Sequence, residues 1–153
     1  MPDTVTRLHR LRGTLAIANA KLAYRTCRQV FSGSGWSELA ADGATSQRCL
    51  WASTSTKDPA YRDVGYVEEL IGPETVDTMP RETIAAFLDH GQVHATLTTR
   101  VDEAERTLQA FAKAGIDYDD VTATLERQGV QRFADSFDQL FDDVQAKRQA
   151  LVA

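Results

Sequence analysis

Apolar residues recur at three- and four-residue steps near the start of the chain, the pattern of an amphipathic helix over about residues 4–31. The apolar positions are Leu8, Leu11, Leu15, Ala18 and Leu22. Basic residues between them predict the solvated side of this helix: Arg7, Arg10, Arg12, Lys21 and Arg25. A Gly-Ser-Gly run at residues 33–35 ends the helix, and residues 36–39 predict one further helical turn.

A short apolar run and a second short segment predict β-strands that are buried on both faces. The first covers residues 48–53 and the second residues 75–79. Residues 66–71 between them predict a short helix closed by a Gly-Pro pair. Pro80 favours the first turn of a helix that runs to about His90 and stops at Gly91. This order predicts parallel strands joined by helical crossovers.

Residues from 101 onward predict helices only. Asp102 opens the first, which Gly115 closes. Asp119 or Asp120 caps the second, which ends near Gly129, and the third covers residues 130–151. The third helix repeats apolar side chains on one side, which predicts core packing. They are Phe133, Phe137, Leu140, Phe141 and Val144.

Two double-sided parallel strands are too few for a stable sheet, since such strands need neighbours on both sides. No internal repeat, low-complexity segment or linker is visible in the chain. The 153 residues therefore predict a single, incomplete domain that is part of a larger α/β domain.

Charge and composition argue against several classes of binding partner. A net charge of −5 argues against nucleic acid and anionic membranes, which bind basic surfaces. No run approaches the roughly 18 apolar residues of a membrane span, and the first residues lack the apolar core of a secretory signal. Cys27 and Cys49 form no framework and predict two reduced, buried thiols. We therefore expect a cytoplasmic protein.

The segment after the first predicted strand is the strongest candidate site. Residues 53–57, here called the hydroxyl-rich loop, read Ser-Thr-Ser-Thr-Lys, and an Asp-Pro pair follows. Hydroxyls donate hydrogen bonds and an ammonium supplies charge, which suits a phosphate at the carboxyl end of a parallel strand. An ordinary polar loop after a core strand fits the local pattern equally well.

Other constellations favour structural roles. His90 and His94 are four residues apart, but Gly91 breaks the helix that would align them, so helix-end histidines are favoured over a metal site. The acidic residues at 117, 119 and 120 favour helix capping over calcium, because no EF-hand spacing follows. Ser53 lacks the nucleophile-elbow pattern of a serine triad.

Four stretches in order resemble the C-terminal portion of transaldolases, in the bacterial branch that includes fusions with glucose-6-phosphate isomerase. The first two are LAIANAKLAYRTCRQVFSG (residues 15–33) and LWASTSTKDPAYRDVGYVEELIGPETVDTMP (residues 50–80). The others are FLDHG (residues 87–91) and the segment from GID to LERQGVQRFADSFDQL (residues 115–140).

The resemblance implies an eight-stranded parallel α/β barrel, of which this chain holds the seventh and eighth strands. The chain would then be mostly helical, with about two strands. In better-studied transaldolases the position matching Ser53 holds the substrate phosphate together with an arginine just after it. No arginine lies in this loop, so Lys57 is the nearest substitute. The expected phosphate-binding residues are Ser53, Thr54 and Lys57.

Transaldolases move a dihydroxyacetone unit between sugar phosphates of the pentose phosphate pathway, converting sedoheptulose 7-phosphate and glyceraldehyde 3-phosphate to erythrose 4-phosphate and fructose 6-phosphate. They use no cofactor. A Schiff-base lysine of the fourth strand, an acid/base aspartate of the first strand and a glutamate near the barrel centre do the chemistry. The four lysines here (21, 57, 113 and 147) fall outside predicted strands, and a hydroxyl-rich loop keeps Lys57 protonated.

The sequence therefore leaves several functions open. The first, which the resemblance implies, is the phosphate-binding side of a transaldolase that is inactive alone and whose partners would be a sugar phosphate and either the missing N-terminal half of the barrel or a second copy. The alternative is a non-catalytic α/β fragment that binds a phosphate anion or a partner chain. A helical interaction module is a third reading, based on the tail alone. A split enzyme, a frameshifted remnant and a fragment of a longer chain are all compatible with the sequence.

Overall fold

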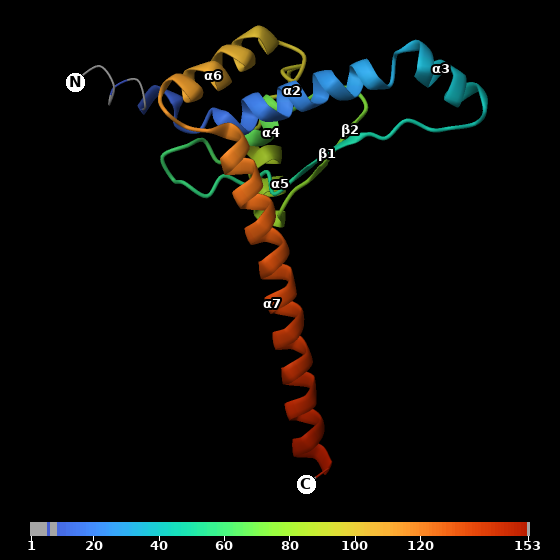
Figure 1. Ribbon diagram of the computed structural model, residues 1–153. Helices are drawn as coiled ribbons and strands as arrows, with labels where there is room; N and C mark the ends of the chain where they lie inside the picture. Colours follow the sequence, from blue (N-terminus) through green and yellow to red (C-terminus); the bar gives the residue numbers. More distant parts are fainter. Residues whose placement is uncertain (1–5, 7–8, 153) are drawn as a thin grey trace. The chain divides into compact units, whose positions relative to one another are not determined.

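The computed structural model describes residue 6 and residues 9–152 of the chain (Figure 1). The chain divides into two compact units, Met1–Ala110 and Phe111–Ala153. The first unit contains both strands, and the second contains the whole of the long last helix. No helix in the described part of the chain is long and apolar enough to cross a membrane.

The first helix is shorter than the apolar pattern predicts. Helix α2 covers Leu15–Val30, and a turn at residues 12–14 precedes it. Gly13 takes φ +76°, and a Cβ there would lie 3.2 Å from the Tyr61 ring. The prediction of one continuous helix is therefore wrong at this turn, and Leu8 lies outside the described residues. Helix α3 covers Ser34–Ala41, longer than the single turn predicted.

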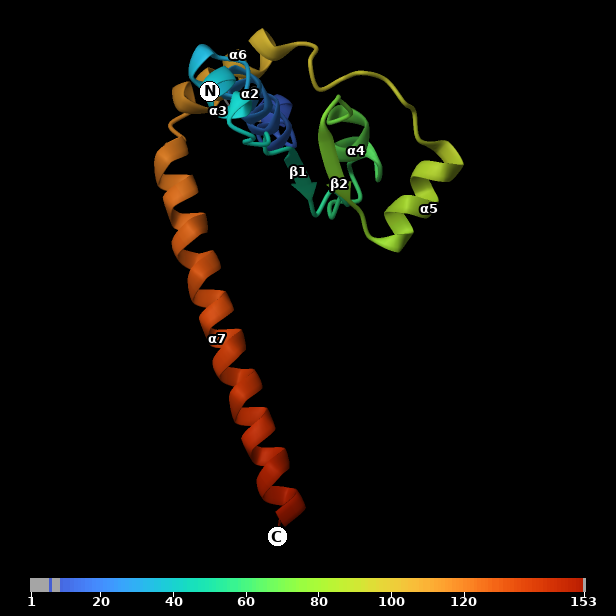
Figure 2. The same ribbon diagram turned by 90° about the vertical axis from the view of Figure 1, so that its right-hand side faces the viewer.

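The two predicted strands are confirmed and pair in parallel. Strand β1 is Cys49–Ala52 and strand β2 is Thr75–Thr78, aligned from Cys49 against Thr75 to Ala52 against Thr78. Helix α4, Gly65–Glu69, lies in the crossover between them, and helix α5, Arg81–His90, follows β2 (Figure 2). Burial on both faces is wrong for β1, because Leu50 is 55% exposed.

A small apolar core joins α2, α4 and the segment before α6. Tyr24, Leu70 and Leu97 are its buried members, and Trp51 of β1 packs against them. The Tyr24 hydroxyl donates to the Pro73 carbonyl at 2.9 Å, which anchors α2 at the entry to β2. A Cβ at Gly72 would lie 2.7 Å from Leu97 Cδ2, so the core requires glycine at this position.

Lys21 is buried, although the basic pattern of α2 places it on the solvated side. Its side chain is 4% exposed, and its ammonium donates to Glu69 Oε2 at 3.0 Å. The same group donates to the Thr96 carbonyl at 3.0 Å and the Thr99 carbonyl at 3.5 Å. The predicted exposure of Lys21 is wrong, because the ammonium has acceptors from two segments distant in sequence.

The sequence predicts three helices after residue 100, whereas residues 101–152 form two, and the residue that caps the last one also differs. Helix α6 covers Val101–Lys113, and helix α7 runs without a break over Tyr118–Val152. Gly129 therefore does not separate two helices; glycine inside a helix costs only about 1 kcal/mol relative to alanine. Capping by the acidic cluster is confirmed, but the cap is Asp117, whose carboxylate accepts the Asp119 and Asp120 amides at 3.0 and 3.2 Å.

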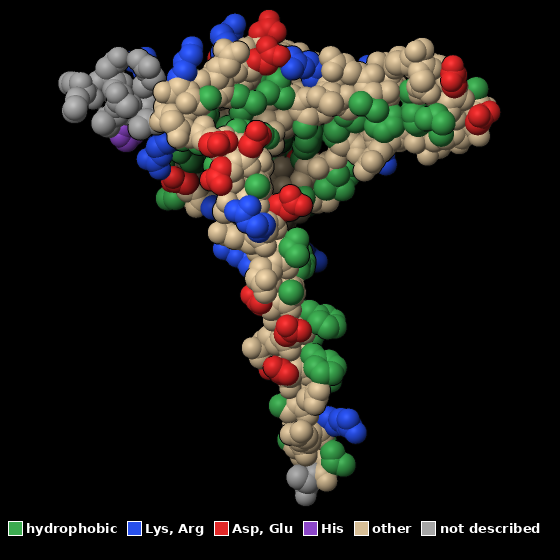
Figure 3. Space-filling view, viewed as in Figure 1, with side chains coloured by type: hydrophobic (Ala, Val, Ile, Leu, Met, Phe, Trp, Pro, Cys, Tyr) green, Lys and Arg blue, Asp and Glu red, His purple; other side chains and the backbone are tan. Residues whose placement is uncertain are grey.

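The prediction that the aromatic stripe of α7 is core is wrong for this chain. All five side chains of the predicted stripe are more than half exposed. Within the part of the chain that the structure describes, this apolar face is therefore not buried (Figure 3).

Because the Lys21 ammonium is buried, removing it should lower the free energy of unfolding more than breaking a surface ion pair does. Lys21→Met removes the charge that Glu69 faces, and we expect a loss of about 3 kcal/mol in the free energy of unfolding. Urea denaturation followed by tryptophan fluorescence measures it.

Arg12→Met is the matched control, because the Arg12–Asp58 pair at 3.3 Å is exposed on both sides. We expect it to cost less than about 1 kcal/mol. Equal losses for both variants would contradict a stabilising role for the buried Lys21 contacts.

Candidate functional site

The hydroxyl-rich loop leaves β1 at the edge where β2 also ends. Because the two strands pair in register, Ala52 and Thr78 lie opposite one another and both carboxyl ends meet at this edge. Ser53 is exposed and takes φ +58°, a left-handed conformation that serine seldom adopts. Such strained residues cluster at binding sites, and here the strain turns the chain sharply out of the strand.

Thr54 connects the loop to the second strand. Its side chain is buried, and its hydroxyl donates to Asp77 Oδ1 at 2.9 Å. Burial raises the pKa of Asp77, and the Thr54 hydroxyl and the Thr78 amide offset part of that rise. The single hydroxyl proton of Thr54 is thus already donated. The sequence analysis did not single out Asp77; the available signal was a carboxylate in a strand whose other residues are Thr75, Val76 and Thr78.

Ser55 offers an unused hydroxyl. Its Oγ is buried and has no hydrogen-bond partner among the described residues. The next hydroxyl, that of Thr56, donates to the Arg62 carbonyl at 2.9 Å and closes the loop. Buried hydroxyls are normally paired, so Ser55 stands out as the buried hydroxyl of this loop that lacks a partner within the described chain.

Lys57 is exposed beyond the hydroxyls, and no ion pair joins it to another described residue. Asp58 turns the chain after it by accepting the Ala60 amide at 2.9 Å. Arg62, the next arginine along the chain, already has partners for its guanidinium. It donates to both oxygens of Glu68 at 2.7 and 2.8 Å and to the His90 carbonyl at 2.9 Å. Lys57 is therefore the unpaired cation of this loop.

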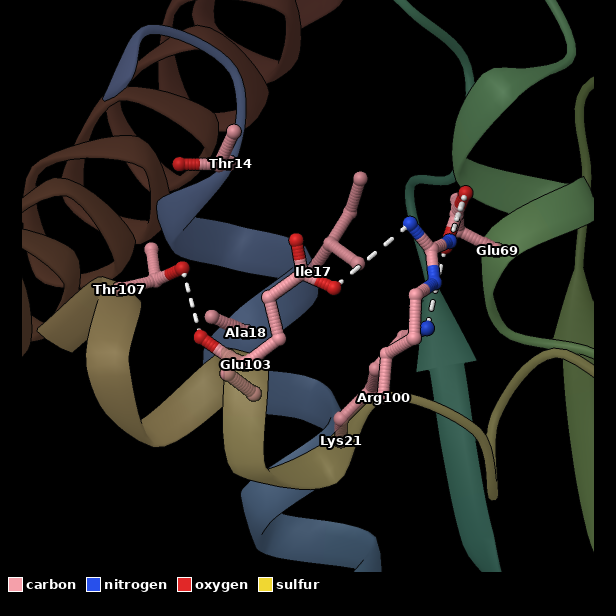
Figure 4. Close-up of a pocket in the computed structure, with 9 residues that line it drawn as sticks. Thr14, Ile17, Ala18, Lys21, Glu69, Arg100, Glu103 and Thr107 are labelled. Atoms are coloured by element: carbon pink, nitrogen blue, oxygen red, sulfur yellow. Dashed lines mark hydrogen bonds and ion pairs between the residues drawn. The ribbon is translucent and has the colours of Figure 1, made fainter. Parts of the chain in front are cut away.

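A cavity of about 160 Å³ lies around Lys21, Glu69 and Arg100, and Figure 4 shows the ion pairs that line it. Arg100 Nη2 donates to both Glu69 oxygens at 3.0 Å. Burial favours a higher pKa for Glu69, but the Lys21 and Arg100 contacts outweigh it and lower the pKa. Lys21 thus donates to Glu69 and to two carbonyls, which makes it a structural cation and not a nucleophile.

A second cavity of about 180 Å³ is lined by Thr56, Tyr61 and Tyr66 among others. Neither cavity includes Ser53, Thr54 or Lys57. Of the hydroxyl-rich loop, Thr56 lines the second of these cavities, and Ser53 and Lys57 are exposed.

The remaining sequence candidates occupy structural positions. The part of the chain that the structure describes contains no cluster of three metal-ligating side chains. His90 ends α5 and bonds to Asp63 and Asp89 at 3.0 Å each, whereas His94 is exposed in the following segment. Neither Cys27 nor Cys49 forms a disulfide. Burial, and to a smaller extent the hydrogen bond with Cys27, raises the pKa of Cys49 to about 11. The Cys49 thiol is therefore protonated at neutral pH.

Comparison with known proteins gives one consistent family. The family described as transaldolase/fructose-6-phosphate aldolase matches residues 2–144. The chain is 52% identical over 135 residues to a transaldolase of Frankia alni, covering 88% of this chain and 36% of that protein. It is 53% identical over 126 residues to a transaldolase of Acidothermus cellulolyticus, covering 82% and 34%. The chain thus spans about a third of the length of these relatives.

The His90 contacts predict a pH-dependent contribution to stability. Hydrogen bonds with Asp63 and Asp89 raise the pKa of His90, and the His90 contact lowers the pKa of Asp63. The stabilisation is fully present below the unfolded histidine pKa of about 6.5 and is lost as the pH rises through the raised folded pKa. As the pH falls below about 4, protonation of Asp63 also removes this stabilisation.

His90→Gln should therefore destabilise the chain more at pH 6 than at pH 8, as measured by urea denaturation at both values. His94→Gln is the control and should show no such difference. A His90 effect that is independent of pH would mean that the ring contributes packing and hydrogen bonding without its charge.

Proposed function

Because this chain belongs to the transaldolase/fructose-6-phosphate aldolase family, we propose that it supplies the phosphate-binding side of a transaldolase barrel. The complete enzyme transfers a dihydroxyacetone unit from sedoheptulose 7-phosphate to glyceraldehyde 3-phosphate in the pentose phosphate pathway. In this proposal residues 1–153 form the C-terminal segment of the barrel domain, with β1 and β2 as its last two strands. A cytoplasmic location is part of the same proposal.

The observation that carries the proposal is the geometry of the hydroxyl-rich loop. It leaves a parallel strand at the carboxyl edge, where barrel enzymes bind ligands and where the loops after the last two strands often hold phosphate. Ser53 turns out of the strand in a left-handed conformation, and Lys57 is an exposed cation a few residues later. Family membership and local chemistry therefore support the same residues.

We assign different roles to the residues of the loop. Ser53 and Lys57 contact the substrate phosphate, Ser53 through a hydrogen bond and Lys57 through its charge. We include Thr54 in the phosphate-binding set as a residue that positions the loop. Its hydroxyl donates to Asp77 and so holds the loop on β2. Ser55 is an added candidate, since its buried hydroxyl has no acceptor in the described chain.

The substitution of lysine for arginine has a physical consequence. A guanidinium can hold two phosphate oxygens at once, whereas an ammonium acts as a point charge on a flexible stem. Lys57 should therefore attract the phosphate without fixing its orientation, and the hydroxyls of the loop supply that orientation. Phosphate binding through this loop needs no metal or other cofactor.

The Schiff-base step requires a lysine that this segment does not provide. Lys21 is held as a buried ammonium by Glu69, and Lys57 is exposed in a polar loop. Lys113 and Lys147 lie on α6 and α7. We therefore propose that the Schiff-base lysine and the acid/base carboxylates come from a transaldolase N-terminal half, and that residues 1–153 alone are inactive.

A second function is favoured by the two-stranded sheet. Leu50 of β1 is more than half exposed, and a parallel pair of strands leaves unpaired hydrogen-bonding groups at both edges. A non-catalytic fragment with these features would bind a phosphate anion through the loop or a partner chain through the sheet. Transaldolase activity on mixing with an N-terminal half distinguishes the first function from this one.

The proposal predicts that the chain alone forms no Schiff base. Incubation with fructose 6-phosphate and borohydride should leave its mass unchanged, because no lysine is both desolvated and unpaired. A full-length transaldolase treated in parallel is the positive control. A stable three-carbon adduct on any lysine of the chain, detected by mass spectrometry, would contradict the assignment.

A second prediction concerns Lys57 and needs a complete barrel, made by joining residues 1–153 to a transaldolase N-terminal half. Lys57→Ala should lower kcat/KM for fructose 6-phosphate by about 10- to 100-fold, because a hydrogen bond to a charged group contributes about 1.5–3 kcal/mol. The value for unphosphorylated fructose should change by less than about threefold, since fructose lacks the group that Lys57 binds.

Arg48→Ala is the matched control, because Arg48 is an exposed cation at the amino end of the same strand. It removes one positive charge and should affect both substrates by less than about threefold. Equal losses on both substrates for Lys57→Ala would show that Lys57 shapes the site in general, and the phosphate assignment would be dropped.

A further inference from the structure

Helix α2 and strand β1 each carry one cysteine, and the two thiols lie against each other. Cys27 lies in the last turn of α2, and Cys49 is the first residue of β1. A hydrogen bond joins the two side chains. The Cys27 thiol also donates to the carbonyl of Gln47, two residues before Cys49, with 3.7 Å between sulfur and oxygen. Both cysteines are half-buried, and neither forms a disulfide.

The packing of α2 on β1 explains why these two residues meet. Cys27 follows Tyr24 by three residues, so the two side chains lie on the same face of α2. Tyr24 is a buried member of the small apolar core, and Cys49 packs against that core from β1. Both cysteines belong to the first compact unit. The contact between the thiols is therefore a product of the same core that holds α2 on the strand.

Thiols in this arrangement meet the main requirement of a disulfide. The bond joins cysteines whose Cβ atoms lie about 3.5–4.5 Å apart, and side chains in hydrogen-bonding contact come close to that separation. Turning the two side chains then brings the sulfur atoms together. Disulfides of cytosolic proteins are usually transient and respond to oxidants, which is the class that a half-buried, reduced pair fits.

We propose that Cys27 and Cys49 are a redox pair, which an oxidised low-molecular-weight disulfide such as glutathione disulfide converts to an intramolecular disulfide between α2 and β1. The proposal does not depend on the transaldolase function. The bond would fasten the first residue of the strand that leads into the hydroxyl-rich loop at Ser53.

The reaction consists of two thiol–disulfide exchanges. The Cys27 thiolate attacks one sulfur of glutathione disulfide, forms a mixed disulfide and expels one glutathione thiolate. Cys49 then loses its proton, attacks the Cys27 sulfur and expels the second glutathione thiolate. The two leaving thiolates take up the two protons. The chain thus gives up two electrons and two protons, and one glutathione disulfide is reduced to two glutathione thiols.

The order of the two exchanges follows from the Cys49 environment. Burial and the Cys27 contact raise the pKa of Cys49 to about 11, so little of it is thiolate at neutral pH. The thiolate is the attacking form, which makes Cys27 the first to react and Cys49 the residue that resolves the mixed disulfide.

The equilibrium constant for disulfide formation, measured on the folded chain and on the same chain in urea, tests the proposal. Contact between the thiols should favour the bond in the folded chain by about 100-fold, the factor expected for closing a loop of about 20 residues. Glutathione buffers of varied composition set the equilibrium, and mass spectrometry after acid quenching and alkylation counts the products. The expected product has lost two hydrogen atoms, links the peptides that contain residues 27 and 49, and does not depend on protein concentration.

A chain with Cys27→Ser and Arg28→Cys is the matched control. Residue 28 is exposed and lies on a different face of α2, while the loop that the bond closes is shorter by one residue. In the folded state its constant should be at least about tenfold lower than that of the 27–49 pair, and in urea the two should agree within about threefold. Circular dichroism checks that both chains keep their helices.

Single variants test the order of the exchanges. Cys49→Ser should accumulate a mixed disulfide of Cys27 with glutathione, because no second thiol resolves it. In Cys27→Ser, Cys49 should react about tenfold more slowly, because its thiolate is scarce. Faster modification of Cys49 than of Cys27 would overturn the assignment of Cys27 as the attacking thiol.

A 27–49 constant that is no larger in the folded chain than in urea overturns the proposal, because thiols held in contact bond more readily than those on a free chain. Glutathione adducts on both cysteines without the 27–49 bond also overturn it. So does a product that consists of chains linked to one another, since the bond is then intermolecular.

Discussion

The buried ammonium of Lys21 is the contact on which the first unit depends. It joins α2 to Glu69 at the end of α4 and to the carbonyls of Thr96 and Thr99. These segments are distant in sequence, and together with the small core of Tyr24, Leu70 and Leu97 they hold the crossover between β1 and β2. An unpaired ammonium at this position would be costly to bury, so each of the three acceptors matters.

The position of the candidate site follows from the parallel pairing of two short strands. Because β1 and β2 are in register, the hydroxyl-rich loop begins where β2 ends, and the Thr54–Asp77 hydrogen bond spans the two strands. The loop keeps a buried hydroxyl without an acceptor at Ser55 and an exposed cation at Lys57. Unused donors beside an exposed cation are the kind of groups that can hold a phosphate.

The features that depend on local pattern were predictable. The two strands, the short helix between them and the helix that follows Pro80 lie close to the predicted residues, because periodicity and Gly or Pro punctuation are local signals. The turn at Gly13 and the unbroken α7 were not predicted. In the first case a contact with Tyr61 accompanies the positive φ, and in the second the helix tolerates Gly129 at modest cost.

The sequence by itself determined the order of elements as far as α6, the parallel connection and the hydroxyl-rich loop as the candidate phosphate site, since each rests on residues adjacent in the chain. Only the tertiary structure decided that Lys21 is buried, that Thr54 donates to Asp77 and that the Ser55 hydroxyl lacks a partner. Those outcomes depend on acceptors contributed by, or missing from, segments remote in sequence. The exposure of the α7 stripe has the same origin, because an apolar face is core only where a partner covers it.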